Sequence, residues 1–301
     1  MTSSSEQRRA EPQPQEEPDF SQSALCIMGG KGRMGRWFEA LFRAAGLKPS
    51  IVDLDNYPPP SEAASWDVIV LATPVAAIEG VMKTIGRFMR PDALLMDISS
   101  VKHKPIRLML RHSPSEVIGA HPLFGPSAES ISNQTFFLCP VRTTKWLRPV
   151  RKFFEGLGAR LVEIDPEEHD RLMACCQTLR HVMLAALGQT LGALGYHAER
   201  DADVMGMWFH QLMTMLRRQS QQPSELYADI ALENPYAFDA VRVFQSYLNA
   251  FVDAIAAQNR DMIIEAMDDA VKSCGSTADE SVAVRGWWWG LGGDSRHTEP
   301  E

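Results

Sequence analysis

Three glycines at fixed spacing are the first residues of this chain with a definite chemical use. They form Gly30-x-Gly32-x-x-Gly35, between an apolar run over 24–28 and a helical pattern over 37–45. Glycines in such a strand–loop–helix unit allow a tight turn, close approach of the backbone to a pyrophosphate, and close packing of helix on strand. The amide groups at the helix start then face the phosphates. The predicted dinucleotide-binding residues here are Gly30, Gly32, Arg33, Met34 and Gly35.

An acidic residue follows where a cofactor ribose would need one. The short β-rich run 50–52 ends at Asp53, about 20 residues after the loop. A carboxylate there accepts hydrogen bonds from the ribose hydroxyls and repels a 2′-phosphate, which favours NAD over NADP. Asp55 is the alternative, because boundaries read from a sequence shift by a few residues. The next apolar strand ends at Thr73 and Pro74, which we also expect to contact the cofactor.

Ser100, Lys102 and His121 are the residues best suited to catalysis, because each follows an apolar strand. We expect a doubly wound sheet of order 3-2-1-4-5-6, in which ligands bind beyond the carboxyl ends of the strands flanking the reversal of strand order. A neutral imidazole at His121 can accept an alcohol proton as hydride leaves. We expect Ser100 to orient the other ring nitrogen and Lys102 to attract an anionic substrate. Each residue also has a structural alternative. Ser100 would be a helix cap, Lys102 a solvated surface charge, and His121 a histidine at a strand end that is bonded to backbone carbonyls.

The elements that position these residues change in character near residue 165. Before it, short apolar strands alternate with helical segments, which indicates a mainly parallel sheet covered on both faces. Asp165-Pro166-Glu167-Glu168 is a strong helix start, and the pattern is helical from there to about residue 274. Gly188, Gly192 and Gly195 recur on one helix, where they would let another helix approach. The predicted fold is a Rossmann-type α/β domain followed by an all-helical domain.

These patterns divide the chain into four segments. We expect a disordered polar tail at 1–22, an NAD-binding domain at 23–165, a helical substrate and dimerisation domain at 166–275, and a C-terminal tail at 276–301. The apolar stripes of the helical domain are too extensive for a small solitary bundle, which predicts a homodimer. We expect the tryptophans at 287–289 in the last segment to dock on the body of the protein.

Composition excludes several classes of function. The chain has 301 residues, 45% hydrophobic and 23% charged, with a net charge of −8, which argues against nucleic-acid binding. Its apolar runs are too short to span a membrane, and the first twenty residues lack the apolar core of a secretory signal. The five cysteines show neither metal-ligand spacing nor a disulfide framework, so we expect no metal and a reducing, cytoplasmic setting.

Six segments in order resemble the prephenate dehydrogenases of tyrosine biosynthesis, above all the type fused to chorismate mutase. They are 29–36, 97–102, 121–126, 168–170, 179–181 and 226–230, and together they extend over roughly residues 24 to 272. The resemblance implies NAD as cofactor and a cyclohexadiene dicarboxylate as substrate. Hydride would leave C4 of prephenate while the ring carboxylate leaves as carbon dioxide, and the product would be 4-hydroxyphenylpyruvate.

The resemblance also implies roles for single residues. The histidine matching His121 contacts the 4-hydroxyl group, and the serine matching Ser100 supports that histidine. The lysine matching Lys102 lies in the active site, and the histidine matching His181 lies near the substrate or a tyrosine inhibitor. Tyr227, in the last segment, is also expected to bind the substrate.

A family arginine that binds a substrate carboxylate falls at Arg218, with Arg217 beside it. Helix neighbours point about 100° apart, so we expect one of the two to enter the site. Arginine suits this task because its planar guanidinium can bind a carboxylate through two parallel hydrogen bonds. Arg180 is a second basic candidate, with a structural ion pair as its alternative role.

Two departures from the family pattern concern the substrate. Ser127 stands where the family often has Asp, and His210 stands where a further arginine is expected. Both positions lie where substrate polarity would be read, so 4-amino-4-deoxyprephenate and arogenate remain alternative substrates. A non-catalytic NAD-binding sensor is an alternative of another class, against which Ser100, Lys102 and His121 argue.

Overall fold

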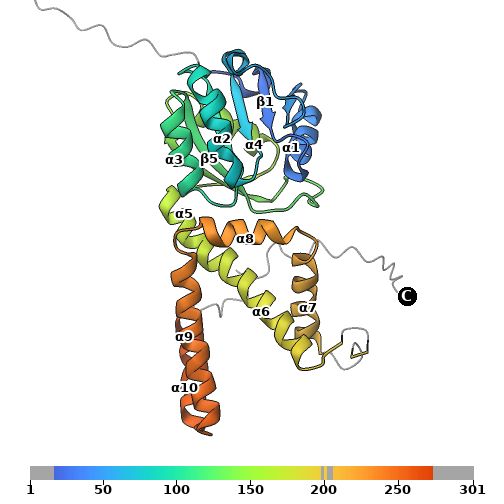
Figure 1. The fold of residues 1–301 in the computed structure, drawn as a ribbon, viewed down its shortest axis with the longest axis vertical. Helices are drawn as coiled ribbons and strands as arrows, with labels where there is room; N and C mark the ends of the chain where they lie inside the picture. The colour runs from blue at the N-terminus through green and yellow to red at the C-terminus, as the bar shows by residue number, and fades with distance from the viewer. Residues whose placement is uncertain (1–16, 198–199, 202–205, 274–301) are drawn as a thin grey trace, which may run out of the picture. The chain divides into compact units, whose positions relative to one another are not determined.

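The computed structural model describes residues 17–197, 200–201 and 206–273 (Figure 1). These residues form two compact units, of which the first ends at Ala237 and the second begins at Phe238. The first unit contains a seven-stranded sheet with its covering helices and a group of further helices. The remaining residues, including Cys274 and the predicted tryptophan-bearing tail, lie outside the described part of the chain.

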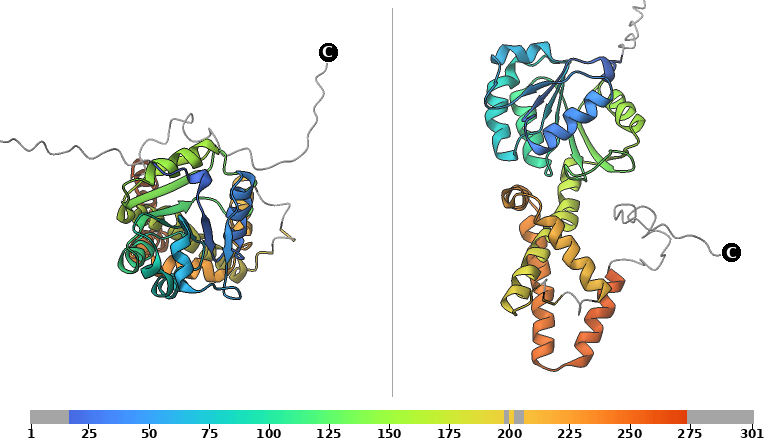
Figure 2. Two further views of the ribbon diagram at one scale, coloured as in Figure 1. Left: turned by 90° about the horizontal axis from the view of Figure 1, so that it is seen from above. Right: turned by 90° about the vertical axis from the view of Figure 1, so that its right-hand side faces the viewer.

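Figure 2 shows the sheet with helices packed on it. The sheet has the strand order β2-β1-β3-β4-β5-β6-β7. Its strands are β1 (Leu25–Met28), β2 (Ser50–Val52), β3 (Val68–Leu71), β4 (Leu94–Asp97), β5 (Glu116–Pro122), β6 (Thr135–Arg142) and β7 (Arg160–Glu163). All neighbouring strands are parallel except β5 and β6, which are antiparallel. The predicted mainly parallel sheet is therefore confirmed, and each strand coincides with an apolar run of the sequence.

The predicted strand order 3-2-1-4-5-6 is wrong in one respect. Only β2 lies beyond β1, so the chain crosses back after two strands and β3 takes the place beside β1. The reversal of strand order therefore lies between β1 and β3, where Thr73 follows β3. Ser100 and Lys102 follow β4, one strand further along the same edge, and His121 lies near the end of β5.

Helices cover both faces of this sheet. They are α1 (Arg33–Ala44), α2 (Val75–Ile85), α3 (His103–His112) and α4 (Leu147–Gly156), with the short 3-10 helices η1 (Phe20–Gln22), η2 (Pro60–Ser65) and η3 (Gly86–Phe88). One core contains Ile27 of β1 together with Phe38 of α1. The other contains Cys26 of β1 together with Met82 of α2. Adjacent residues of β1 thus enter opposite cores, as the pleat of a strand requires.

The predicted disordered tail at 1–22 is too long. Phe20 is 2% exposed, and its ring packs against Phe153 with the ring centroids 4.6 Å apart. A tilted ring pair at this distance is a favourable arrangement for two aromatic side chains. Residues 20–22 therefore belong to the ordered domain, because one aromatic side chain in an otherwise polar segment completes an aromatic core.

After β7 the described chain is helical. The first unit continues with α5 (Pro166–Met173), the π-helical segment η4 (Ala174–Leu179), α6 (Arg180–Ala193), α7 (Met207–Gln219) and α8 (Ser224–Glu233). The helix start at Asp165 is as predicted, because its carboxylate accepts a hydrogen bond from Glu167 N at 2.8 Å. Gly188 gives the expected close approach, since a Cβ atom there would lie 3.0 Å from Leu216 Cδ2 of α7. Gly192 has open space around it.

The second unit contains α9 (Ala237–Ala256), except for its first residue, and α10 (Arg260–Ser273). α9 exposes a series of large apolar side chains, namely Phe238, Val243, Tyr247, Leu248, Val252 and Ile255. Among the described residues no helix is long and apolar enough to cross a membrane.

A buried carboxylate fixes the loop between β6 and α4. Glu116 is 5% exposed and accepts hydrogen bonds from the Thr143 and Thr144 hydroxyls at 2.8 and 2.5 Å. It also accepts the backbone amides of Thr144 and Trp146 at 2.9 and 3.1 Å. Burial by itself would raise the pKa of Glu116, but these hydrogen bonds outweigh it, so the pKa is lowered from the ordinary 4.5.

We expect Glu116→Gln to lower the free energy of unfolding at pH 7 by about 2 kcal/mol, because an amide nitrogen cannot accept these donors. The lowered pKa means that the stabilisation is present above the unfolded value of 4.5 and is lost as pH falls through the folded pKa. Denaturant titrations from pH 7 to pH 3 check this. The difference between wild type and variant should shrink with acidification, and a constant difference would contradict the assignment.

Candidate active site

The glycine loop has the close contacts that a phosphate-binding loop needs. Gly29 has a φ of +79°, and a Cβ atom there would lie 2.8 Å from the carbonyl oxygen of Ala72. A Cβ atom at Gly35 would lie 2.4 Å from Gly29 O, so α1 can pack this close only with glycine. The tight turn assigned to Gly30 is therefore at Gly29, while Gly30 makes room for Ile51, whose Cγ2 would be 2.7 Å from a Cβ atom.

The start of α1 fits a diphosphate group. Gly32 is the N-cap of α1 and provides no side-chain hydrogen bond to the first turn of this helix. The amide groups of that first turn are therefore open to a ligand. Thr73 Oγ1, on the loop after β3, is buried without a hydrogen-bond partner among the described residues. Met34 packs partly buried against the core, while Arg33 is exposed. These features make the carboxyl edge of β1 and β3 the candidate nucleotide cradle of this chain.

The two candidate acids after β2 have different surroundings. Asp53 is half-buried, and its Oδ2 accepts a hydrogen bond from Lys31 N of the glycine loop at 3.0 Å. Asp55 is 68% exposed and forms an ion pair with the Lys31 ammonium. Asp53 is thus the carboxylate whose oxygen contacts the backbone of the loop, and its role toward a cofactor ribose stays a prediction.

Lys102 lies inside the protein rather than in the cleft. Its side chain is 0% exposed, and its ammonium forms an ion pair with Asp97, which is also 0% exposed. The ammonium donates to Ala120 O at 2.6 Å and lies 3.4 Å from Ser99 Oγ. Its three donors thus face protein acceptors, so the expectation that Lys102 attracts an anionic substrate is corrected to a structural role.

The expected support of His121 by Ser100 is likewise replaced. His121 Nδ1 lies 2.9 Å from His169 Nε2 of α5. His169 Nδ1 lies 2.8 Å from Asp170 Oδ1, and both residues are 0% exposed. Ser100 is half-buried and has no hydrogen bond to His121. His169 and Asp170 were missed because the Glu168-His169-Asp170 segment was treated only as a family motif at a helix start.

Asp170 also attaches the helical segment to the sheet edge. Its Oδ1 accepts the backbone amide of Lys102 at 2.8 Å, and its Oδ2 accepts that of His103 at 2.8 Å. These are amides at the start of α3, where a carboxylate is favoured by the helix dipole. Asn234, just after α8, donates to the backbone oxygen of Asp170 at 2.8 Å.

Both histidines are held in the neutral form. Burial holds the pKa of His121 well below its usual range, and the neighbouring His169 and Lys102 lower it further. Burial also lowers the pKa of His169, although the hydrogen bond with Asp170 opposes this effect. His121 Nε2 has no hydrogen-bond partner among the residues that the structure describes. It is therefore the atom of this group that can accept a proton from a ligand.

His181, Arg180 and Tyr227 form a second cluster, on α6 and α8. Arg180 Nη2 lies 2.8 Å from His181 Nε2, and the His181 and Tyr227 rings meet edge to face with centroids 4.5 Å apart. Burial and, to a smaller extent, the Arg180 charge together lower the pKa of His181 to about 4, so this imidazole is neutral at pH 7. Burial raises the pKa of Tyr227, against the charges of Arg180 and Arg33.

The predicted carboxylate-binding pair lies on the last turn of α7. Arg217 and Arg218 are both exposed, and neither guanidinium has a hydrogen bond or ion pair to a described residue. They precede Gln219, whose Nε2 donates to His181 O at 3.1 Å. The structure therefore brings Arg180, His181 and Tyr227 together. It leaves both arginines of α7 open to a ligand and does not show which of the two would bind a carboxylate.

α8 and the residues just before it contact α1 and α3 of the sheet domain (Figure 1). Two residues before α8, Gln222 Oε1 accepts a hydrogen bond from Arg33 of α1 at 2.8 Å. At its end, Glu233 forms an ion pair with Lys104 of α3 at 2.5 Å. The helical segment thus contacts the sheet domain from the glycine loop to the start of α3, which are the elements that carry the predicted site.

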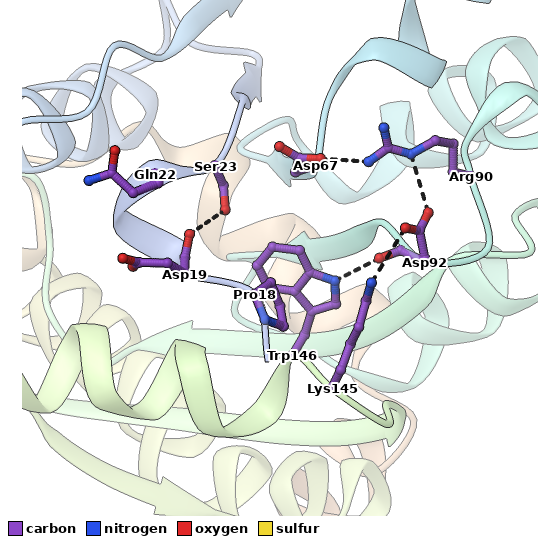
Figure 3. Close-up of a pocket in the computed structure, with 9 residues that line it drawn as sticks. All are labelled: Pro18, Asp19, Gln22, Ser23, Asp67, Arg90, Asp92, Lys145 and Trp146. Atoms are coloured by element: carbon purple, nitrogen blue, oxygen red, sulfur yellow. Dashed lines mark hydrogen bonds and ion pairs between the residues drawn. The ribbon is translucent and has the colours of Figure 1, made fainter. Parts of the chain in front are cut away.

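A separate cleft of about 250 Å³ lies at the amino edge of the sheet. Figure 3 shows residues that line it. Asp67 and Asp92 precede β3 and β4, and both form ion pairs with Arg90, at 2.5 and 3.2 Å. Trp146 Nε1 donates to Asp92 O at 2.8 Å. These polar groups satisfy one another, and the cleft lies on the edge opposite to the glycine loop, so it does not belong to the candidate site.

Relatives of known name cover most of this chain. It is 28% identical over 274 residues to the probable arogenate/prephenate dehydrogenase of Methanocaldococcus jannaschii, covering 84% of this chain and 61% of that protein. It is 29% identical over 233 residues to the T-protein of Enterobacter agglomerans, covering 77% of this chain and 61% of the relative. The chain thus spans about three fifths of the length of these curated relatives.

A solved structure has the same fold. Prephenate dehydrogenase from A. aeolicus, in complex with hydroxyphenyl propionate and NAD+, superposes with a TM-score of 0.66 at 22% identity. The superposition covers 85% of this chain and 99% of that one.

Two family models match successive parts of the sequence. Residues 38–163 match the nucleotide-binding domain of prephenate dehydrogenase, and residues 165–269 match its dimerization domain. The first match begins after the glycine loop, whose assignment therefore rests on the sequence pattern and on the contacts described above. With both domains present in order, this chain belongs to the prephenate dehydrogenase family.

Proposed function

We propose that this protein is an NAD-dependent dehydrogenase that converts prephenate to 4-hydroxyphenylpyruvate by oxidative decarboxylation. The observation that carries the proposal is His121, a buried neutral histidine at the carboxyl edge with one ring nitrogen left free. It lies on β5, two strands from β3, whose loop forms part of the nucleotide cradle.

His121 has the properties of a general base for an alcohol. Nε2 can accept the proton of the 4-hydroxyl group while the C4 hydride leaves, because the neutral imidazole retains a lone pair there. NAD, when bound, supplies the hydride acceptor. The burial of His121 excludes water from the proton acceptor, and aromatisation of the ring accompanies loss of the ring carboxylate.

The cofactor proposal is NAD rather than NADP. Asp53 lies at the edge of the glycine loop, where a carboxylate would accept hydrogen bonds from ribose hydroxyls and repel a 2′-phosphate. Gly30, Gly32 and Gly35 with the start of α1 would hold the diphosphate, with Thr73 Oγ1 as a further donor. The matched family model describes a nucleotide-binding domain, which supports a nucleotide cofactor, and the choice of NAD over NADP rests on Asp53.

The proposal of a dicarboxylate substrate rests on the arginine side chains near Tyr227. Burial raises the pKa of Tyr227, and the charges of Arg180 and Arg33 lower it. Arg217 and Arg218 on α7 have no side-chain partner among the described residues. One of this pair would bind a substrate carboxylate. The same chemistry on arogenate or 4-amino-4-deoxyprephenate is the second candidate, and it is favoured by Ser127 and His210, both exposed, where the family pattern has charged residues.

We also propose a homodimer formed through the helical part of the chain. The matched family model is described as a dimerization domain. The exposed apolar side chains of α9, such as Phe238 and Ile255, give such an interface a source of hydrophobic stabilisation.

An absorbance assay of NADH formation tests the proposal directly. Prephenate, arogenate and 4-amino-4-deoxyprephenate are offered in turn with NAD and then with NADP. Oxidation of prephenate with NAD supports the first candidate, and preference for an amino compound supports the second. If NAD binds but none of the three is oxidised, the enzyme proposal fails in favour of a sensor.

We expect His121→Asn to lower kcat by roughly 10²–10⁴, because the amide cannot take up the proton. The affinity for NAD should stay the same, since His121 does not form the nucleotide cradle. Steady-state kinetics and a fluorescence titration with NAD check the two parts. An unchanged kcat would remove His121 from the mechanism.

We expect either Arg217→Ala or Arg218→Ala, but not both, to raise KM for the substrate roughly 10- to 100-fold through loss of a charge-assisted contact. The reason is that neighbours on a helix point in different directions. Each variant serves as the control for the other, and kcat is measured in parallel. If neither KM changes, a different cation, such as Arg180, binds the carboxylate.

A further inference from the structure

We infer that His169 and Asp170 are positioning residues that hold His121 in the tautomer able to accept a proton. The inference rests on the proposed function, because it concerns the residue proposed as the general base. Neither residue needs to touch the substrate, since they would act through the ring nitrogen of His121 that faces away from it.

Asp170 determines the hydrogen position on His169. Both of its carboxylate oxygens already accept backbone amides, from Lys102 and from His103. The atom facing His169 Nδ1 at 2.8 Å is therefore an acceptor, so Nδ1 carries the hydrogen. A neutral histidine has one N–H group, which leaves His169 Nε2 with a lone pair.

His169 in turn determines the hydrogen position on His121. Its Nε2 lone pair faces His121 Nδ1 at 2.9 Å, so Nδ1 must donate. The lone pair of neutral His121 is then on Nε2, the free nitrogen. In the other tautomer two lone pairs would face each other inside the protein, and an N–H group instead of a base would face the substrate.

The surroundings give the two rings little freedom to rearrange. The rings of Phe137 on β6 and His169 pack edge to face, with ring centroids 5.4 Å apart and an interplanar angle of 86°. His121 and His169 meet at 70° with centroids 5.1 Å apart. His169 and Asp170 are 0% exposed, so water does not compete for these hydrogen bonds.

Asp170 is a poor residue to vary, because its loss would also remove the two amide contacts at α3. His169 provides a matched pair of variants. His169→Gln keeps a side-chain acceptor that can reach His121 Nδ1, whereas His169→Met has similar length and no comparable acceptor. A packing role would affect the two variants alike, and a tautomer role would separate them.

Imidazole ¹⁵N NMR tests the tautomer without any catalytic turnover. The His121 resonances are assigned by their absence in His121→Asn. We expect the Nδ1–H form in wild type and in His169→Gln, and a shift toward the Nε2–H form in His169→Met. The inference is overturned if wild-type His121 carries its hydrogen on Nε2, or if His169→Met leaves the tautomer unchanged. Both results stand even if none of the three substrates is oxidised.

Kinetics then test the consequence, with whichever substrate the wild type oxidises. We expect His169→Met to lower kcat roughly 10²-fold, less than the ~10⁴-fold that a wrong histidine tautomer costs in a Ser–His–Asp triad. KM and NAD affinity should not change, and His169→Gln should recover most of kcat. Equal losses in the two variants that follow their melting temperatures would show a packing role and overturn the inference.

Discussion

The carboxylate of Asp170 is the interaction on which the candidate site depends. It accepts the backbone amides of Lys102 and His103 at the start of α3. It also contacts His169, its neighbour on α5. A helix start needs acceptors for its amides, and here the acceptor comes from another part of the chain. One buried group therefore fixes the loop after β4, the position of α5, and the ring that faces His121.

A second buried charge pair makes this edge of the sheet rigid. Lys102 and Asp97 are both fully buried, so loss of either partner would leave an uncompensated buried charge. Asp97 Oδ1 has no hydrogen-bond partner among the described residues, so the pair depends on the contacts of Asp97 Oδ2 and of the ammonium. Ala120 O accepts from the ammonium, and Ser99 Oγ donates to Asp97. The charge of Lys102 then acts on His121 from inside the protein, where it helps to keep the imidazole neutral. Its effect on the site is electrostatic rather than by contact with a ligand.

The sequence predicted what local patterns determine and failed where distant partners decide. The strands, the glycine loop and the helix start at Asp165 follow from periodicity and capping, and they were found. The predicted strand order was wrong because apolar runs indicate the strands but not the place of each strand in the sheet. Lys102 was misassigned because spacing along the chain does not reveal that Asp97, five residues earlier, is buried with it. His169 was missed as a partner of His121 because 48 residues separate them.

Charge near the second cluster bears on the choice of substrate. His181 is neutral, so the positive charge that acts around Tyr227 belongs to Arg180 and Arg33. Arg180 donates to His181 Nε2, which leaves the hydrogen of that ring on the buried, unpartnered Nδ1. The cations near Tyr227 favour an anion and offer little to an ammonium group. A substrate with two carboxylates and no amine gains most from such surroundings, which supports prephenate over its amino analogues.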